Sequence, residues 1–139
     1  MPNTRNVTWN EIQQSINVLY DALCNEFFKY QKFTHLTFYG VSKGGIIPAT
    51  LLAKLWGNST VAVISSFAIK AQPYCVYDII VDDICDSGKT LSMVKSKCIG
   101  NPKILTLFRR YNSEIDVDKY AELITNDDWI IFPWEDGVE

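Results

Sequence analysis

The sequence predicts one α/β domain spanning residues 1–139, with a mainly parallel sheet and helices on both faces. Three observations support this prediction. Short apolar runs alternate with segments of helical periodicity. The length of 139 residues is typical of a single domain, and 47% of the residues are hydrophobic, which is enough for a buried core. Because parallel strands need crossover connections, alternation of strands and helices favours a parallel sheet.

A long first helix is predicted from its start signal and its apolar spacing. Thr8 and Glu11 stand three residues apart, the pattern of a capping box. Apolar residues then recur at helical spacing until near Lys29. The short apolar run 36–41 follows, bounded by glycine, and indicates a buried strand.

A second helix and a second strand are expected next. Residues 46–55 have helical spacing, with Pro48 in the first turn, where a missing N–H is tolerated. Gly57 provides a C-terminal stop. The β-rich run 61–66 then predicts a strand.

The second half of the chain continues the alternation. A third strand is expected to end where a run of acidic residues begins, and a helix follows that run. The predicted ranges are 77–81 (strand), 90–98 (helix), 103–108 (strand) and 121–124 (strand).

Two polar segments follow predicted strands, at 42–45 and 82–90. In open parallel sheets, ligands bind beyond the carboxyl ends of the strands. Both segments should therefore lie on one edge of the sheet and form a single site.

The adjacent carboxylates Asp82 and Asp83 indicate a partner that carries positive charge or donates hydrogen bonds. Adjacent buried carboxylates repel each other and lose solvation. Vicinal ribose hydroxyls can donate to them, and Mg²⁺ prefers a few carboxylates together with water and substrate phosphates. We expect these two residues to contact ribose and to be the metal ligands.

The next residues predict a monophosphate site at the start of a helix. Backbone N–H groups there attract anions, helped by the helix dipole. Glycine lets the ligand approach the backbone, and two hydroxyls add donors. The expected phosphate-binding residues are Asp86, Ser87, Gly88, Lys89 and Thr90.

Three other kinds of structure can be compared with this segment. A nucleoside-triphosphate P-loop requires a glycine where Asp83 stands, although Gly88, Lys89 and Thr90 match its end. A calcium-binding EF-hand loop is disfavoured by Cys85 and Ser87 at two of its ligand positions. A solvated acidic turn that caps a helix remains open on this segment alone.

Composition limits the remaining classes. The net charge of −3 disfavours general nucleic-acid binding. No two of the four cysteines form a C-x-x-C pair, and the chain has one histidine, so a zinc site is disfavoured. The cysteines suggest reduced thiols in a cytoplasmic protein. No apolar run is long enough for a membrane span.

The segment 79–91 resembles the phosphoribosyl pyrophosphate signature of type I phosphoribosyltransferases, in which a hydrophobic strand precedes two acidic residues and D-[ST]-G-x-T. Residues 7–9, 41–48 and 129–134 resemble further blocks of the members that act on 6-oxopurines, in the same order. The resemblance implies transfer of the 5-phosphoribosyl group to N9 of xanthine, guanine or hypoxanthine. It also implies Mg²⁺ as cofactor and assembly into homodimers or homotetramers.

The resemblance further assigns roles to individual positions. Asp86 would lie near N7 of the purine and assist its proton loss. The pyrophosphate-binding residues would be Ser42, Lys43 and Gly44, with a strained peptide bond before Lys43. The base-binding residues would be Arg110, Trp129 and Ile130, with Arg110 in place of a lysine that donates to the 6-oxo group.

The chain departs from the family in the segment 67–77, which is shorter than the usual mobile loop, and in Lys43, which replaces an arginine. The short segment supports an alternative function, a non-catalytic sensor of phosphoribosyl pyrophosphate or nucleotide on the same fold. A pyrimidine substrate is disfavoured by Arg110 and the 129–130 segment.

Overall fold

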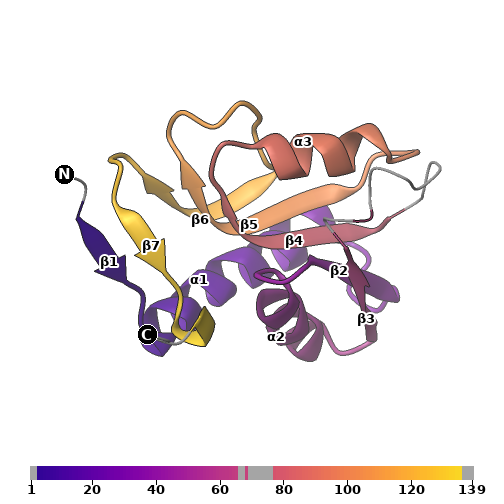
Figure 1. Cartoon of the computed structure of the whole chain (residues 1–139). Coiled ribbons are helices and arrows are strands. Elements are labelled where there is room, and N and C mark those ends of the chain that lie inside the picture. Colours follow the sequence, from indigo (N-terminus) through magenta and orange to yellow (C-terminus); the bar gives the residue numbers. More distant parts are fainter. Residues whose placement is uncertain (1–2, 66–67, 69–76, 136–139) are drawn as a thin grey trace.

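The computed structural model describes residues 3–65, 68 and 77–135. Five parallel strands form the main sheet, in the order β3-β2-β4-β5-β6 (Figure 1). The strands are β2 (Leu36–Val41), β3 (Ser59–Ile64), β4 (Ile79–Cys85), β5 (Lys103–Arg110) and β6 (Lys119–Ile124). All five predicted strands are therefore present, and the predicted parallel pairing is confirmed.

Helices cover both faces of this sheet, as predicted. On one face lie α1 (Trp9–Ala22) and α2 (Ile46–Trp56), and on the other lies α3 (Lys89–Ser96) (Figure 1). Each layer has its own buried cluster. Phe38 and Leu105 belong to the cluster on the α1–α2 side, and Ile80 and Leu91 belong to the cluster on the α3 side.

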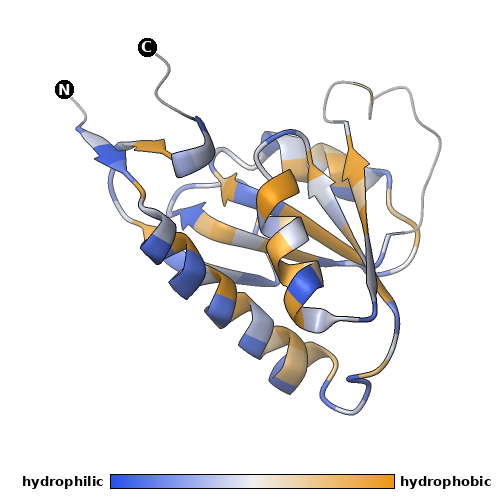
Figure 2. Ribbon diagram, turned by 90° about the horizontal axis from the view of Figure 1, so that it is seen from below, coloured by the Kyte–Doolittle hydropathy of each residue, from blue (hydrophilic) through white to orange (hydrophobic). Residues whose placement is uncertain are grey.

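The start of α1 follows directly from the sequence. The Thr8 hydroxyl accepts a hydrogen bond from the Glu11 N–H, and the Glu11 carboxylate accepts one from the Thr8 N–H, which completes the capping box. Ile12, Ile16 and Leu19 are fully buried, and the polar side of the helix faces outward (Figure 2). The helix continues as a π-helical turn, η1 (Leu23–Phe27).

A second, two-stranded sheet was not expected. It pairs β1 (Thr4–Asn6) in parallel with β7 (Trp129–Ile131), and a 3₁₀ turn, η3 (Pro133–Glu135), follows. Arg5 holds β1 against α1 through an ion pair with Glu11 and against the main sheet through one with Glu122. Strands of three residues are too short for a recognisable periodicity, so the sequence alone does not reveal them.

The strand order places a crevice between β2 and β4. The chain enters the sheet at β2, adds β3 on one side and then adds β4, β5 and β6 on the other, so the direction of winding reverses between β2 and β4. Open α/β sheets bind ligands at such a switch point, beyond the carboxyl ends of the strands. The pairing of β2 with β4 stops at Gly40 and Val81, which leaves the later part of β4 open on that side.

The sequence places the end of the third strand at Val81, and this boundary is wrong. The strand β4 continues to Cys85 because Asp82, Ile84 and Cys85 pair with β5. Asp82 and Asp83 therefore belong to a strand rather than to a loop. Although successive strand side chains start from opposite faces, the two carboxyl groups lie close enough to interact with each other.

Candidate active site

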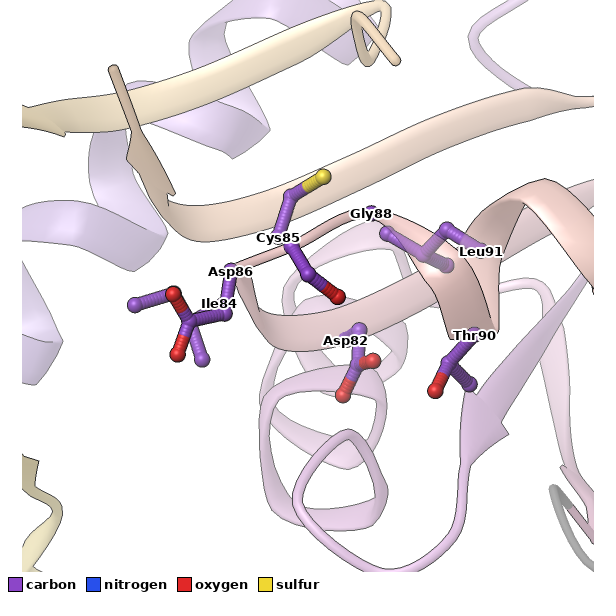
Figure 3. A pocket seen from close by; sticks show the side chains of 8 residues that line it. Asp82, Ile84, Cys85, Asp86, Gly88, Thr90 and Leu91 are labelled. Carbon is purple, nitrogen blue, oxygen red and sulfur yellow. The ribbon is translucent and has the colours of Figure 1, made fainter. Parts of the chain in front are cut away.

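The turn between β4 and α3 surrounds a small cavity of about 80 Å³. Ser87, Gly88 and Thr90 line it, together with Asp82 and Asp86. In Figure 3 the side chains of Asp82 and Thr90 project to the same side of this turn. The size of the cavity and the helix start beside it suit a phosphate group.

Gly88 shapes this turn. Its φ of 89° lies in the left-handed region, and it forms the N-cap of α3 without a side-chain hydrogen bond. An added Cβ would meet the backbone nitrogens of Glu114 and Ile115 at 3.1 Å. Only glycine therefore satisfies both the backbone conformation and the space here. The first amides of α3 have no partners within the helix, as at any helix start.

The acidic pair is held by its own backbone. Asp82 Oδ1 accepts a hydrogen bond from the Asp83 N–H at 2.8 Å, and Asp83 Oδ1 accepts one from the Ile84 N–H at 2.7 Å. Burial raises the pKa of Asp82 well above its ordinary value, and the neighbouring Asp83 charge adds to the effect. Burial also raises the pKa of Asp83. A cation or hydroxyl donors would favour the charged forms of both groups.

The turn after β2 lies directly against this pair. The peptide bond between Ser42 and Lys43 is cis. The Gly44 backbone contacts the Asp83 carboxylate so closely that an added Cβ would overlap it. Gly45 similarly contacts the backbone of β4 at Val81 and Asp82. The two polar segments predicted from the sequence therefore meet at the β2–β4 crevice, as expected.

A second cavity, of about 170 Å³, adjoins the acidic pair on the side of the small sheet. Asp86, Arg110, Trp129 and Ile130, which the sequence analysis singled out, all line it. The Trp129 side chain is 65% exposed, so its ring is available to a ligand. The cavity has an aromatic wall and polar groups, which suits a planar heterocycle.

Two positions differ from the expectations. Lys89 is exposed and does not line the cavity at the turn between β4 and α3, although its N–H stands at the start of α3. Glu135 was not singled out, yet it lines the second cavity together with Asp83 and contributes to the raised pKa of that carboxyl. Its position depends on η3 and on a hydrogen bond that its Oε1 accepts from the Phe132 N–H at 3.2 Å. No local signal in the sequence marks this contact.

The donor set of the acidic pair fits Mg²⁺. Magnesium in phosphate-transferring sites usually takes one or two protein carboxylates and completes its shell with water and substrate phosphates. Asp82 lines the cavity at the β4–α3 turn and Asp83 lines the second cavity, so the pair offers two carboxylates where the cavities adjoin. No cluster of three or more His, Cys, Asp or Glu side chains occurs in the described part of the chain.

Comparisons with known proteins agree with this geometry, although no profile of a known protein family matches the chain. A xanthine-guanine phosphoribosyltransferase from Cereibacter sphaeroides is 30% identical over 112 residues, which cover 69% of this chain and 66% of the relative. The match therefore spans just under two thirds of that relative's length. The protein of the same name from Chromohalobacter salexigens is 24% identical and is matched over 95% of this chain and 84% of its own.

Solved structures of other proteins share this fold. The crystal structure of a purine phosphoribosyltransferase from Pyrococcus horikoshii superposes with a TM-score of 0.73 at 24% identity, covering 99% of this chain and 97% of the other. By sequence and fold, the chain is similar to type I phosphoribosyltransferases. A protein from Neisseria gonorrhoeae with bound ppGpp has a TM-score of 0.68 at 16% identity and covers 99% of this chain and 92% of its own.

We expect Gly44→Ala to weaken ligand binding at the β2–β4 crevice by about tenfold, with phosphoribosyl pyrophosphate as the probe, since overpacking displaces neighbouring groups. The new methyl group would overlap the Asp83 carboxylate and push it out of place. Titration calorimetry with Mg²⁺ present measures the change. Gly57→Ala is the control, because that glycine has a φ of 97° and open space around it. It should lower the melting temperature and leave the affinity unchanged.

Proposed function

We propose that the protein transfers the 5-phosphoribosyl group of phosphoribosyl pyrophosphate to N9 of a 6-oxopurine, giving a nucleoside monophosphate and pyrophosphate. The observation that carries the proposal is the junction of two cavities at the acidic pair. One cavity suits a phosphate, the other suits a planar base, and Asp82 and Asp83 stand between them. A ribose that carries a 5-phosphate and receives a base at C1 spans the same arrangement.

The sugar phosphate would be held from two sides. Ser87, Gly88 and Thr90 line the cavity for the 5-phosphate, with helix-start amides that attract the anion. Asp82 and Asp83 would accept hydrogen bonds from the ribose hydroxyls. Bound Mg²⁺ would neutralise charge on the departing pyrophosphate.

The pyrophosphate would lie at the turn formed by Ser42, Lys43 and Gly44. This turn meets β4 through contacts of Gly44 with Asp83 and of Gly45 with Val81. Lys43 is exposed, so its ammonium group is free to approach an anion from solvent. As the bond between C1 and the pyrophosphate oxygen breaks, the positive groups here would stabilise the leaving charge.

The base would lie between Trp129 and the Asp86–Arg110 pair. As N9 forms its bond to C1, the proton on N7 would pass to the Asp86 carboxylate. Trp129 would stack on the ring, and the Ile130 backbone would contact the 2-substituent. Holding the ring in line with C1 supports the reaction by orientation alone.

A single assay tests the proposal. Protein, Mg²⁺ and phosphoribosyl pyrophosphate are mixed with guanine, xanthine or hypoxanthine, and nucleoside monophosphate and pyrophosphate are quantified. We expect product in proportion to base consumed. Absence of product with all three bases would reject the enzymatic proposal.

A second candidate is a non-catalytic sensor of phosphoribosyl pyrophosphate or nucleotide. The structural likeness to the protein with bound ppGpp supports it, because that protein has a similar fold and binds a nucleotide. The short segment 67–77, which also favoured it, lies outside the described residues except for Ala68 and Tyr77. Calorimetry that shows tight ligand binding without turnover would favour the sensor.

Trp129→Ala should raise the KM for the purine by about tenfold, because stacking of a base on an aromatic ring contributes roughly 1–3 kcal/mol. The KM for phosphoribosyl pyrophosphate should change little, since Trp129 lines only the base cavity. Trp129→Phe keeps an aromatic face and should stay near the wild type. Equal KM values for wild type and Trp129→Ala would exclude stacking on this ring. Steady-state kinetics with each substrate varied in turn supply the values.

A further inference from the structure

Arg110 joins two turns that both border the base cavity. Its Nε donates a hydrogen bond to Asp86 Oδ1 at 3.0 Å. Its Nη1 donates to the carbonyl oxygens of Asn126 and Asp128 at 3.0 and 2.9 Å. The first contact reaches the turn after β4, and the other two reach the turn just before Trp129. One side chain therefore links the proposed proton acceptor to the segment that carries the proposed stacking ring.

The two ends of this ion pair differ in their freedom. The Arg110 side chain is 8% exposed, whereas the Asp86 side chain is 57% exposed. In the described part of the chain, Arg110 is the only residue that hydrogen-bonds to the Asp86 carboxylate. The position of this exposed carboxylate therefore depends on the buried guanidinium.

The geometry of a guanidinium suits this task. It carries five N–H donors in a planar fork, and Nε and Nη1 already use three of them on Asp86 and the two carbonyls. Nη2 has no hydrogen bond to any described residue, and Arg110 lines the base cavity. A lysine has one nitrogen, which cannot reach a carboxylate, two carbonyls and a ligand in these directions.

We infer that Arg110 is the positioning residue of the site, an inference that rests on the proposed transfer to a 6-oxopurine. It aims the Asp86 carboxylate at N7–H of the base by tying the turn after β4 to the turn before Trp129. Donation from Nη2 to the adjacent 6-oxo oxygen is the contact that the family resemblance already assigns to this position. N7 and the 6-oxo group lie on one edge of the purine, so the Asp86–Arg110 pair can hydrogen-bond to both groups at the same time. A 6-amino group would place a donor against the guanidinium donors, which leaves both unpaired.

Arg110→Lys tests the inference by steady-state kinetics with guanine and phosphoribosyl pyrophosphate varied in turn. We expect kcat to fall by about tenfold and the KM for guanine to rise by about tenfold, each the loss of roughly one charge-assisted hydrogen bond. The KM for phosphoribosyl pyrophosphate should stay within about twofold, as expected for a site away from the change. Arg109→Lys is the matched control, because Arg109 pairs with the exposed Asp116 and does not line the base cavity. It should leave kcat and both KM values near those of the wild type.

Arg110→Ala with added guanidinium ion separates positioning from structural support. Millimolar guanidinium should restore part of kcat, because a free ion can occupy the space beside Asp86, and ammonium ion should restore less. Wild-type kinetics in Arg110→Lys would overturn the inference. So would equal losses for guanine and phosphoribosyl pyrophosphate with no response to guanidinium. An inactive wild type would instead reject the proposed function itself.

Discussion

Asp86→Asn should lower kcat by roughly 10²–10⁴-fold, the usual contribution of a general base. The amide keeps an oxygen that can accept the hydrogen bond from Arg110 Nε, so the turn should keep its shape. The amide cannot take the proton from N7. The KM values for the purine and for phosphoribosyl pyrophosphate should therefore change far less than kcat. Initial rates of product formation measure this split.

Asp116→Asn is the control for this experiment. Asp116 is also an acidic residue paired with an arginine, but its side chain is 85% exposed and it lines neither cavity. Its variant should retain wild-type kcat. An Asp86→Asn enzyme with more than half of the wild-type kcat would exclude Asp86 as the proton acceptor. Loss of the melting transition in that variant would instead indicate that Asp86 supports the fold.

Replacing Asp82 and Asp83 together by asparagine should have two opposite effects. Binding of phosphoribosyl pyrophosphate with Mg²⁺ should weaken by about a hundredfold or more, because two charge-assisted contacts are lost. The melting temperature at neutral pH should rise, because the folded state no longer holds two crowded, desolvated carboxyl groups. Calorimetric titration and thermal unfolding of the same samples test both effects.

The direction of the stability effect follows from proton linkage. The pKa of each carboxyl is raised in the folded state from an ordinary value of 3.8. Above 3.8 the folded protein therefore binds more protons than the unfolded chain, and the free energy of unfolding falls as the pH rises through the raised pKa. The stabilisation of the double variant over the wild type should grow across that window and vanish at lower pH. A variant less stable than the wild type at neutral pH would contradict this account.

The same linkage predicts how ligand binding depends on pH. Hydroxyl donors and Mg²⁺ favour the ionised carboxylates, so binding should release protons. The affinity of the wild type for phosphoribosyl pyrophosphate with Mg²⁺ should therefore increase with pH through the raised pKa values of Asp82 and Asp83. The double variant should lose this part of the pH dependence. Titrations in buffers of different ionisation enthalpy count the protons released.

Local signals were sufficient for most elements of the main sheet and its helices. The capping box at Thr8 and Glu11, the apolar run at Leu36–Val41 and Gly57 after α2 each act within a few residues, and the structure confirms all three. The meeting of residues 42–45 with the acidic pair was also predictable, because carboxyl ends of parallel strands share one edge.

The sequence by itself thus determined the parallel sheet, the helical layers and the edge on which the polar segments meet. Tertiary pairing alone decided the rest, since its partners are far apart in the chain. Pairing with β5 extends β4 to Cys85 and places Asp82 against one cavity and Asp83 against the other. Pairing of β1 with β7 sets Trp129 beside the base cavity, and buried contacts with two distant turns fix Arg110 against Asp86. Such long-range contacts leave no periodicity in the local sequence, and only the folded chain reveals them.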